Sequence, residues 1–463
     1  MPHIPDMDSS RPRVAVIDLV GLSRRILPGM PRLSAWAATK KTSSFRPSFP
    51  AVTCTAQSTY LTGLSPEQHG ITGNGWYHRT MCEVQFWKQS DKLVQGEKIW
   101  ETLRRKFGEN FTCAKLFWWY NMYSDVNWSM TPRPMYPADG RKVFDIYTTP
   151  MNLREDVQKD LGRFPFPFFW GPAAGLPSSK WISEAAIWTE NRYKPDLSLV
   201  YLPHLDYDLQ RFGPDTPEAR PAIREADNLA ADLIEFYETR GVIPIVLSEY
   251  GLSPVRRDIA LNRLFRKKGW ITVRNEMNRD MLDCGASHVF AIADHQTAHI
   301  YINDKSLKEE VIRLLKETSG IADIRQVNPD ALPQVTAERH ADLVAVAEAD
   351  AWFSYYYWDD DIHAPDFARC VDIHRKPGYD PAELFLDPSL HCPKLNIGSF
   401  LLKKKLGFRA LLEVIPLNGN LVRGSHGSDL VDEPDRPLCI APPGTPDIVR
   451  PEDIHNVILS AFS

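Results

Sequence analysis

The stretch PAVTCTAQSTYLTGLSPEQHGITGN, Pro50 to Asn74, decides the predicted fold of this chain. It follows a short apolar segment, Val14 to Leu19, which reads as a buried parallel strand and carries Asp18 near its end. A carboxylate at a strand end, followed by small hydroxyl residues that open a helix, is typical of sites that hold metal against phosphate. The helix start offers free N–H groups and a positive dipole to an anion. Thr53, at that start, is the expected point of covalent attachment to substrate, although a helix N-cap is the ordinary role of such a threonine.

Composition narrows the range of functions. The chain has 463 residues, 43% of them hydrophobic, which suffices for one large α/β domain with insertions or for two domains. A net charge of −5 gives no broad attraction to nucleic acid or to anionic lipid, so we expect neither a nucleic-acid polymer nor a membrane as partner. A phosphate site here needs local positive charge, most simply from metal ions. The sequence leaves the oligomeric state open.

The N-terminal segment and the cysteines indicate where in the cell the protein is expected to lie. The segment MPHIPDMDSSRPR is polar and lacks the apolar region of a secretory signal, and no run approaches the ~18 apolar residues of a membrane span. The seven cysteines are odd in number, widely spaced and contain no CxxC pair. We therefore expect reduced thiols and a cytoplasmic location.

Alternating strand and helix patterns predict an α/β fold, with a mostly parallel central sheet flanked by helices on both faces. Strands are expected at 112–117, 197–202 and 242–247, and helices at 55–61, 98–107 and 221–241. This order implies right-handed crossovers, and it places the acids that follow the strands at the carboxyl edge of the sheet, where open α/β folds bind ligands.

Two segments depart from this pattern. Residues 118–170 are rich in aromatics and proline and are interpreted as a long irregular excursion over the sheet edge, either lid-like or a surface wrap. Residues 274–346 are interpreted as a small α+β cap, with a hairpin, a helix and a further strand. The predicted domains are therefore a core of residues 10–273 and 347–463, interrupted by this cap insertion.

The opening stretch resembles the alkaline phosphatase superfamily, and most closely its nucleotide pyrophosphatase/phosphodiesterase branch. In that branch a threonine nucleophile stands nine positions before a Thr-Gly pair, as Thr53 stands before Thr62. A Pro-Glu-x-His-Gly-Ile run, here residues 66–71, then leads to an asparagine that helps to bind the phosphoryl oxygens, here Asn74. The resemblance implies an alkaline phosphatase-like fold and a metal-dependent phosphoester hydrolase that forms a phospho-threonine intermediate on Thr53.

The resemblance also implies two metal sites, of zinc in the family. The matching positions in this chain are Asp18, Thr53, Glu249 and Tyr250 for one site, and Asp206, Gln210 and His426 for the other. Glu249 and Tyr250 replace an Asp-His pair, and Gln210 replaces a histidine. Since zinc prefers imidazole, thiolate and carboxylate, this shift towards oxygen favours Mn, Mg or Fe, with one or two ions per chain.

Further candidates lie outside the matched positions. His204, Asp208 and His374 are alternative ligands, as are His295 and His299 beside Asp294, although an ordinary hydrogen-bonded histidine is the commoner outcome. Arg375 is a candidate for binding the anionic group of the substrate, and a solvated surface charge is the ordinary alternative. The aromatic runs at 76–77, 117–120 and 352–358 are expected to be core in part, and those that face the site would stack a base or another planar leaving group.

Three functions are consistent with these observations. The first is a phosphodiesterase or phosphatase, similar to nucleotide pyrophosphatases, that acts through Thr53. The second is a biosynthetic phosphatase or phosphoryl-transfer enzyme with one altered metal site, which the substitutions at Gln210, Glu249 and Tyr250 suggest. The third is an inactive homologue that binds a phosphate or a metabolite, against which the presence of both Thr53 and Asn74 argues.

Overall fold

The computed structural model describes residues 11–463, so the polar segment of the first ten residues lies outside it. Its centre is an eight-stranded sheet with the order β2-β20-β9-β1-β8-β5-β6-β7. The strands are β1 (Arg13–Leu19), β2 (Lys41–Ser44), β5 (Cys113–Leu116), β6 (Trp128–Pro132), β7 (Ile146–Thr149), β8 (Leu197–Leu202), β9 (Val242–Leu247) and β20 (Leu438–Ala441). The five central strands, β9 to β6, are parallel, and the outer strands are antiparallel. The predicted fold class is confirmed.

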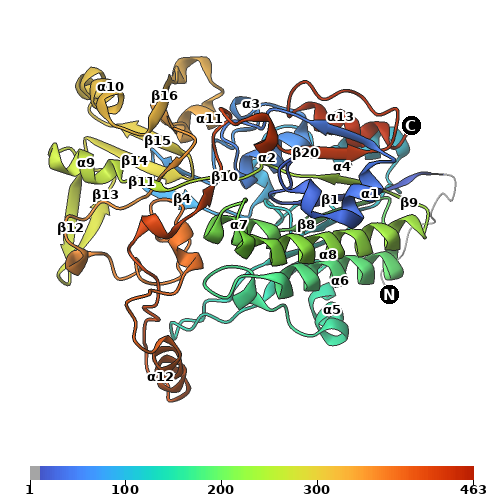
Figure 1. Cartoon of the computed structure of the whole chain (residues 1–463), viewed down its shortest axis with the longest axis horizontal. Helices are drawn as coiled ribbons and strands as arrows, with labels where there is room; N and C mark the ends of the chain where they lie inside the picture. The colour runs from blue at the N-terminus through green and yellow to red at the C-terminus, as the bar shows by residue number, and fades with distance from the viewer. Residues whose placement is uncertain (1–10) are drawn as a thin grey trace.

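Helices cover both faces of this sheet (Figure 1). One layer contains α1 (Pro31–Ala37), α5 (Leu153–Leu161), α6 (Leu176–Tyr193), α7 (His204–Phe212) and α8 (Arg220–Glu238). The other contains α2 (Thr53–Thr62), α3 (Pro66–His69), α4 (Ile99–Phe107) and α13 (Asp453–Ser460). Between these layers β1, with the sequence RVAVIDL, is buried at every position after Arg13, which is why it reads as a continuous apolar run.

The register of β1 brings the predicted acids to one edge. Asp18 lies opposite Tyr201 on β8 and Leu247 on β9, both at the carboxyl ends of their strands. Asp206 and Glu249 follow these two strands directly. Three carboxylates from three neighbouring strand ends therefore meet at the edge where α2 begins.

The interpretation of residues 118–170 as an irregular excursion is wrong. This segment contains β6 and β7, which complete the edge of the central sheet, and α5, which packs on α6 and β7. Some of its aromatic residues belong to the core: Trp118, Trp128 and Phe164 are buried, and Phe164 packs against Trp181 of α6. Interleaved proline and aromatic residues concealed the alternation that identifies a short strand.

A second unit with its own hydrophobic core adjoins the first. Its antiparallel sheet has four strands in the order β14 (Val289–Asp294), β15 (Thr297–Ile302), β17 (Leu343–Ala347) and β16 (Ile321–Gln326). The unit also contains a hairpin of β12 (Thr272–Glu276) and β13 (Arg279–Asp283), and the helices α9 (Leu261–Lys267), α10 (Lys308–Glu317) and α11 (Gln334–Arg339). This core extends from Ile259 to Ala368 and is wider than the predicted cap of residues 274–346. The flanking segments join it because β11 (Arg257–Ile259) pairs with β18 (Ala351–Phe353).

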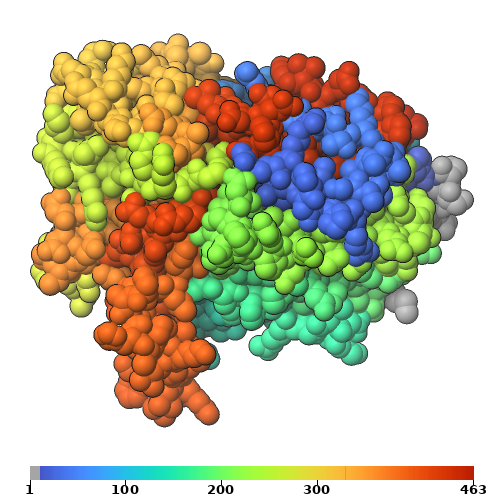
Figure 2. Space-filling model, in the orientation of Figure 1, coloured from blue at the N-terminus to red at the C-terminus, as the bar shows by residue number. Residues whose placement is uncertain are grey.

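Shorter elements connect the two units. They are the hairpin of β3 (Gly75–His78) and β4 (Glu83–Phe86), and the pair of β10 (Ser253–Pro254) and β19 (Gly424–Ser425). Helix α12 (Pro393–Lys405) has no buried residue and projects from the body (Figures 1 and 2). None of the helices in residues 11–463 is both long enough and apolar enough to cross a membrane.

Candidate active site

Thr53 lies at the start of α2 in direct contact with a carboxylate. Its Oγ1 donates a hydrogen bond to Oε2 of Glu249 at 2.7 Å and lies 3.3 Å from the hydroxyl of Tyr250. All three side chains are buried. The residue before the helix, Val52, is extended, so the helix begins at Thr53 and its positive N-terminal end lies at this residue. A hydroxyl that donates to a buried carboxylate has the geometry of a nucleophile with its base.

Asp18 and Glu249 lie close together and share the amide of Gln57. Nε2 of Gln57 donates to Oε1 of Glu249 at 2.6 Å and to Oδ2 of Asp18 at 3.2 Å. Burial raises the pKa of both carboxyl groups, and for Asp18 the nearby charge of Glu249 raises it further. Gln57 is not among the predicted site residues, because no motif distinguishes a carboxamide at this position.

Asn74 is fixed from two sides. Its Oδ1 accepts a hydrogen bond from the backbone N–H of Cys54 at 3.1 Å, in the first turn of α2. Its backbone N–H and its Nδ2 donate to the two oxygens of Asp294, at 2.8 and 3.0 Å. Asp294 ends β14 of the second unit, and burial raises its pKa to about 7. The second unit therefore positions a predicted substrate-binding residue of the first, a role that sequence alone did not indicate.

The second predicted ligand group lies on α7. Nε2 of Gln210 donates to Oδ2 of Asp206 at 2.6 Å, and Oε1 of Gln210 accepts from the hydroxyl of Tyr379 at 3.0 Å. The spacing of four residues places Asp206 and Gln210 on one helix face, as in the Asp-x-x-x-His pattern of the resemblance. Burial raises the pKa of Asp206 to about 7.

His426 belongs to a stack of four rings. The ring centroids lie 3.4 Å apart for Tyr250 and His426, 3.6 Å for His426 and His295, and 3.6 Å for His295 and Tyr379. Burial, and after it the charge of Asp206, raises the pKa of both terminal tyrosines, so Asp206 lies close to the stack at both ends. His295, on the turn between β14 and β15, is thus brought to the site by the second unit.

The donor atoms can be compared with a pair of metal ions. In the group of Asp206 and His426, Oδ1 of Asp206 and Nε2 of His426 are buried without a hydrogen-bond partner, while Nδ1 of His426 lies 2.8 Å from the carbonyl of Ala51. That arrangement fits an ion, because the other ring nitrogen is fixed by a backbone acceptor. In the group of Asp18 and Glu249, Oδ1 of Asp18 is also buried without a partner, but the amide hydrogens of Gln57 are directed at Oδ2 of Asp18 and Oε1 of Glu249, which does not fit a cation between these two oxygens. Residues 11–463 contain no cluster of three or more His, Cys, Asp or Glu residues suited to a metal.

Several predicted residues lie away from Thr53. Nε2 of His204 lies 2.8 Å from Glu225 on α8, and Nδ1 of His374 lies 3.3 Å from the carbonyl of Phe86. Arg375 is half-exposed and pairs with Asp372 and Asp366, and Asp208 pairs with Arg211. These residues make ordinary ion pairs and hydrogen bonds.

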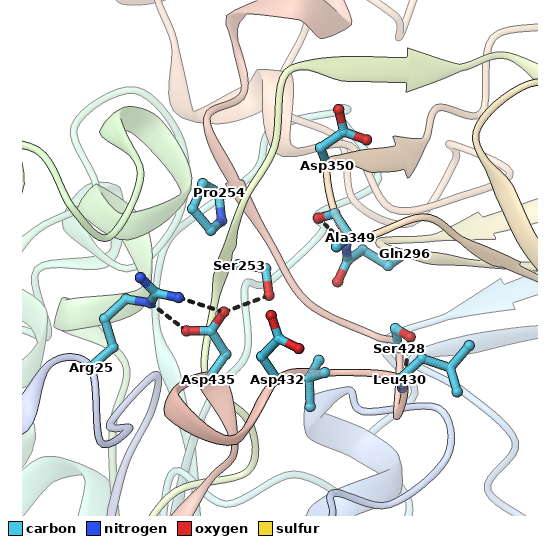
Figure 3. A pocket seen from close by; sticks show the side chains of 11 residues that line it. Arg25, Ser253, Pro254, Gln296, Ala349, Asp350, Ser428, Leu430, Asp432 and Asp435 are labelled. Atoms are coloured by element: carbon cyan, nitrogen blue, oxygen red, sulfur yellow. Dashed lines mark hydrogen bonds and ion pairs between the residues drawn. The ribbon is translucent and has the colours of Figure 1, made fainter.

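A cavity of about 120 Å³ lies beside the loop of His426, at the boundary of the two units (Figure 3). Gln296, which lines it, donates its backbone N–H to the carbonyl of His426 at 2.7 Å. Arg25, Ser253 and Asp435 form a hydrogen-bonded wall of the same cavity. Its volume holds a few water molecules and is too small for a nucleotide, which requires a pocket of roughly 300 Å³ or more.

A mostly parallel sheet with helices on both faces, with a threonine and carboxylates at its carboxyl edge, defines a protein of the alkaline phosphatase superfamily. Residues 14–380 match the model of the type I phosphodiesterase/nucleotide pyrophosphatase family. The chain belongs to this family. Members of this family are described as phosphodiesterases and nucleotide pyrophosphatases, and enzymes of this superfamily are generally dependent on divalent metals.

Related proteins agree with this assignment. An uncharacterized pyrophosphatase/phosphodiesterase of Schizosaccharomyces pombe is 30% identical over 233 residues, which are 47% of this chain and 40% of the relative. An ectonucleotide pyrophosphatase/phosphodiesterase of Caenorhabditis elegans is 33% identical over 99 residues, 21% of this chain and 12% of the relative. The chain thus matches less than half the length of these curated relatives.

Solved structures share the fold. A phosphonoacetate hydrolase from Sinorhizobium meliloti, in complex with phosphonoformate, has a TM-score of 0.59 and 15% identity, with 99% of this chain and 97% of that chain covered. Murine ectonucleotide pyrophosphatase/phosphodiesterase 5, as an inactive variant with AMP, has a TM-score of 0.57 and 15% identity, with 97% and 95% covered. At this identity the likeness concerns the fold alone.

Proposed function

We propose that this protein hydrolyses small phosphoesters, with Thr53 as the nucleophile. The observation that carries the proposal is the buried hydrogen bond of 2.7 Å from the Thr53 hydroxyl to Glu249, at the start of a ten-residue helix. A weak hydroxyl nucleophile needs an adjacent base, and a helix N-terminus stabilises the negative charge of the phosphoryl group. The Thr53 hydroxyl has both the adjacent base, Glu249, and the helix N-terminus.

The chemistry follows from this geometry. Glu249 accepts the proton of the Thr53 hydroxyl as Oγ1 bonds to phosphorus, and the leaving oxygen departs with its electron pair and takes up a proton. Water then attacks the phospho-threonine, breaks the new P–O bond and restores the hydroxyl. The Nδ2 group of Asn74 and the N–H groups at the start of α2 other than that of Cys54, which is bonded to Asn74, hold the nonbridging oxygens. A divalent ion bound by Asp206 and His426 would supply further positive charge to these oxygens.

Turnover of two chromogenic esters tests the proposal. Purified protein is expected to release p-nitrophenol from bis-p-nitrophenyl phosphate or from p-nitrophenyl phosphate, and the ratio of the two rates decides between a phosphodiesterase and a phosphatase. Elemental analysis of the same sample identifies the metal, for which zinc is the expectation by family and Mn, Mg or Fe by the oxygen-rich donors. Protein with its natural metal that turns over neither ester, and that binds phosphate, would favour the inactive homologue. The cytoplasmic location stays a prediction.

Replacement of Asp294 by Asn is expected to raise KM about tenfold with little change in kcat, because one of the two N–H groups of Asn74 loses its charged acceptor. Initial rates over a range of substrate concentrations measure the split. Asp283→Asn, on β13 of the second unit, is the control and should change neither constant. A tenfold fall in kcat would mean that Asp294 does more than position Asn74.

The same variant tests the protonation of Asp294. Since burial raises its pKa from 3.8 to about 7, the folded chain keeps a proton between these values that the unfolded chain has lost. The free energy of unfolding of the wild type is therefore expected to fall, relative to Asp294→Asn, as the pH rises through this window. Urea titrations at pH 4.5 and pH 7 measure this change, and parallel behaviour of the two proteins would contradict the assignment.

A further inference from the structure

Through its amide, Gln57 contacts both of the carboxylates that the resemblance assigns to one metal ion, Asp18 and Glu249. It lies one helical turn after Thr53 on α2, with 1% of its surface exposed. Its Nε2 donates to Glu249 at 2.6 Å and to Asp18 at 3.2 Å. One amide group therefore satisfies an oxygen of each carboxylate.

The orientation of this amide is determined by its other end. Oε1 of Gln57 accepts a hydrogen bond from the backbone N–H of Trp119 at 2.7 Å. Because a backbone N–H can only donate, the oxygen must face Trp119 and the NH₂ group must face the carboxylates. The N–H of Trp119 therefore determines which way the amide of Gln57 faces.

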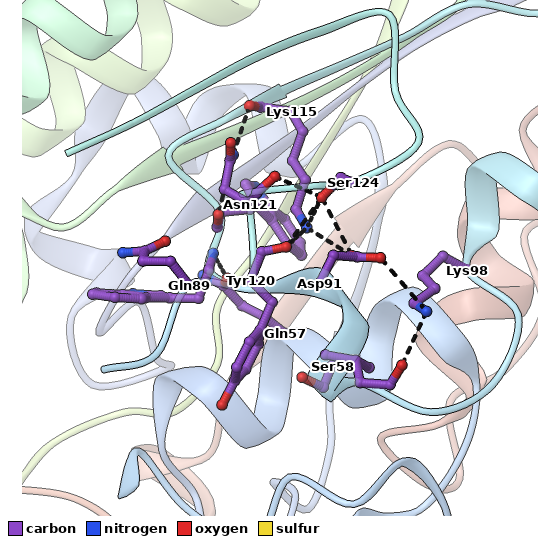
Figure 4. Close-up of polar contacts among 12 residues, drawn as sticks. Gln57, Ser58, Gln89, Asp91, Lys98, Lys115, Tyr120, Asn121 and Ser124 are labelled. Carbon is purple, nitrogen blue, oxygen red and sulfur yellow. Dashed lines mark hydrogen bonds and ion pairs between the residues drawn. The ribbon is translucent and has the colours of Figure 1, made fainter. Parts of the chain in front are cut away.

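Trp119 belongs to a loop, residues 117–124, that is itself held rigidly (Figure 4). Nζ of buried Lys115 donates to the carbonyl of Tyr120 at 2.6 Å and to Oγ of Ser124 at 3.2 Å, and it lies 3.6 Å from Asp91. The side chain of Asn121 donates back to the carbonyl of Lys115 at 2.9 Å. These bonds hold Tyr120 at a positive φ of 50° and fix the N–H that orients Gln57.

A cation between Asp18 and Glu249 would meet the hydrogens of this amide. Those hydrogens carry partial positive charge, and an amide ligates metals through its oxygen, which here is bonded to Trp119. A positive ion and the NH₂ group therefore exclude one another at this position. In the group of Asp206 and His426, the amide of Gln210 also donates to Oδ2 of Asp206, at 2.6 Å, but its orientation is not forced, because its other partner is the hydroxyl of Tyr379, which can donate or accept. Oδ1 of Asp206 and Nε2 of His426 are buried and unpartnered there.

We infer that the carboxamide of Gln57 takes the place of one metal ion of the pair, so that this protein binds one divalent ion per chain, at Asp206 and His426. The inference rests on the proposed function in that it concerns the same site. Gln57 then keeps the Glu249 carboxylate facing the hydroxyl of Thr53, a task that an ion performs where two are bound. The stoichiometry of metal binding follows from the side chain at position 57.

Metal binding by full-length protein tests this inference without turnover. Protein stripped with a chelator is titrated with Mn²⁺ and with Zn²⁺ by calorimetry, and the bound metal is counted by elemental analysis. The wild type is expected to bind one ion, and His426→Ala none. Gln57→Glu, which keeps the acceptor for Trp119 and adds a third carboxylate, is expected to bind two. Gln326→Glu, the same change on an exposed position of β16, should still bind one.

Gln57→Ala provides a second variant in case the added charge of Gln57→Glu prevents folding, which thermal melting of the metal-free proteins would reveal. It removes the amide, and it too is expected to bind a second ion. Two ions in the wild type, none in the wild type, or a single ion in both folded variants would each overturn the inference. One ion in an inactive wild type would support it while contradicting the proposed function.

Discussion

Thr53→Ala is expected to abolish turnover of phosphoesters, with a fall in kcat of roughly 10³-fold or more, because no other hydroxyl of residues 11–463 donates to Glu249. The variant should fold normally, since the substitution removes a small side chain at a helix start. It should also bind inorganic phosphate as tightly as the wild type, because Asn74 and the N–H groups of α2 are unchanged. Steady-state rates and calorimetric titration with phosphate measure the two effects.

Thr53→Ser supplies the matched comparison for this variant. It keeps the hydroxyl and loses one methyl group, so it should retain a measurable part of the rate and form the phosphoryl-enzyme that Thr53→Ala cannot form. Rapid acid quench followed by mass spectrometry would detect the added phosphoryl group on residue 53. Full activity of Thr53→Ala would show that water attacks phosphorus directly and that Thr53 is only the first residue of a helix.

The residues that the sequence identified share one property, which is that a local pattern carries them. Thr53 and Asn74 lie in one continuous stretch, and Asp18 ends a strand whose apolar run is visible without a structure. The strands that precede Asp206 and Glu249, β8 and β9, are likewise short apolar runs that can be recognised in the sequence. For these residues the chain order and the parallel sheet together predict the meeting at the carboxyl edge, and the structure confirms it.

Other parts of the site depend on contacts that no local pattern records. Asp294 and His295 come from the second unit, and Asp294 lies 220 residues after Asn74 in the chain. The sequence offers His295 as a candidate ligand, but only the packing of the two units places Asp294 on Asn74 and His295 on His426. Gln57 lies within the quoted stretch, yet its role depends on the backbone N–H of Trp119. The strands β6 and β7 were missed for a related reason, because proline and aromatic residues are also typical of loops.

The two halves of the site are joined where β19 crosses α7, and this crossing explains the glycine at position 424. A Cβ atom added to Gly424 would lie 2.1 Å from the carbonyl oxygen of Leu209, which is a backbone atom and cannot rotate away. Next to this contact, the N–H of Arg423 donates to the carbonyl of Gln210 at 2.9 Å. The helix that carries Gln210 is thus held directly against the strand that leads to His426.

Gly424→Ala is therefore expected to lower the free energy of unfolding by roughly 3 kcal/mol, because the backbone of β19 or α7 must shift to admit one methyl group. The shift separates His426 from Asp206, so kcat/KM should fall by about 10²-fold and the affinity for Mn²⁺ should fall with it. Urea unfolding, initial rates and calorimetry measure the three effects. Gly398→Ala, on α12 with nothing within 4 Å of its Cβ, should leave activity unchanged and stability the same or slightly higher. Equal stability of the two variants would mean that β19 and α7 are not in contact and that the two ligand groups are positioned independently.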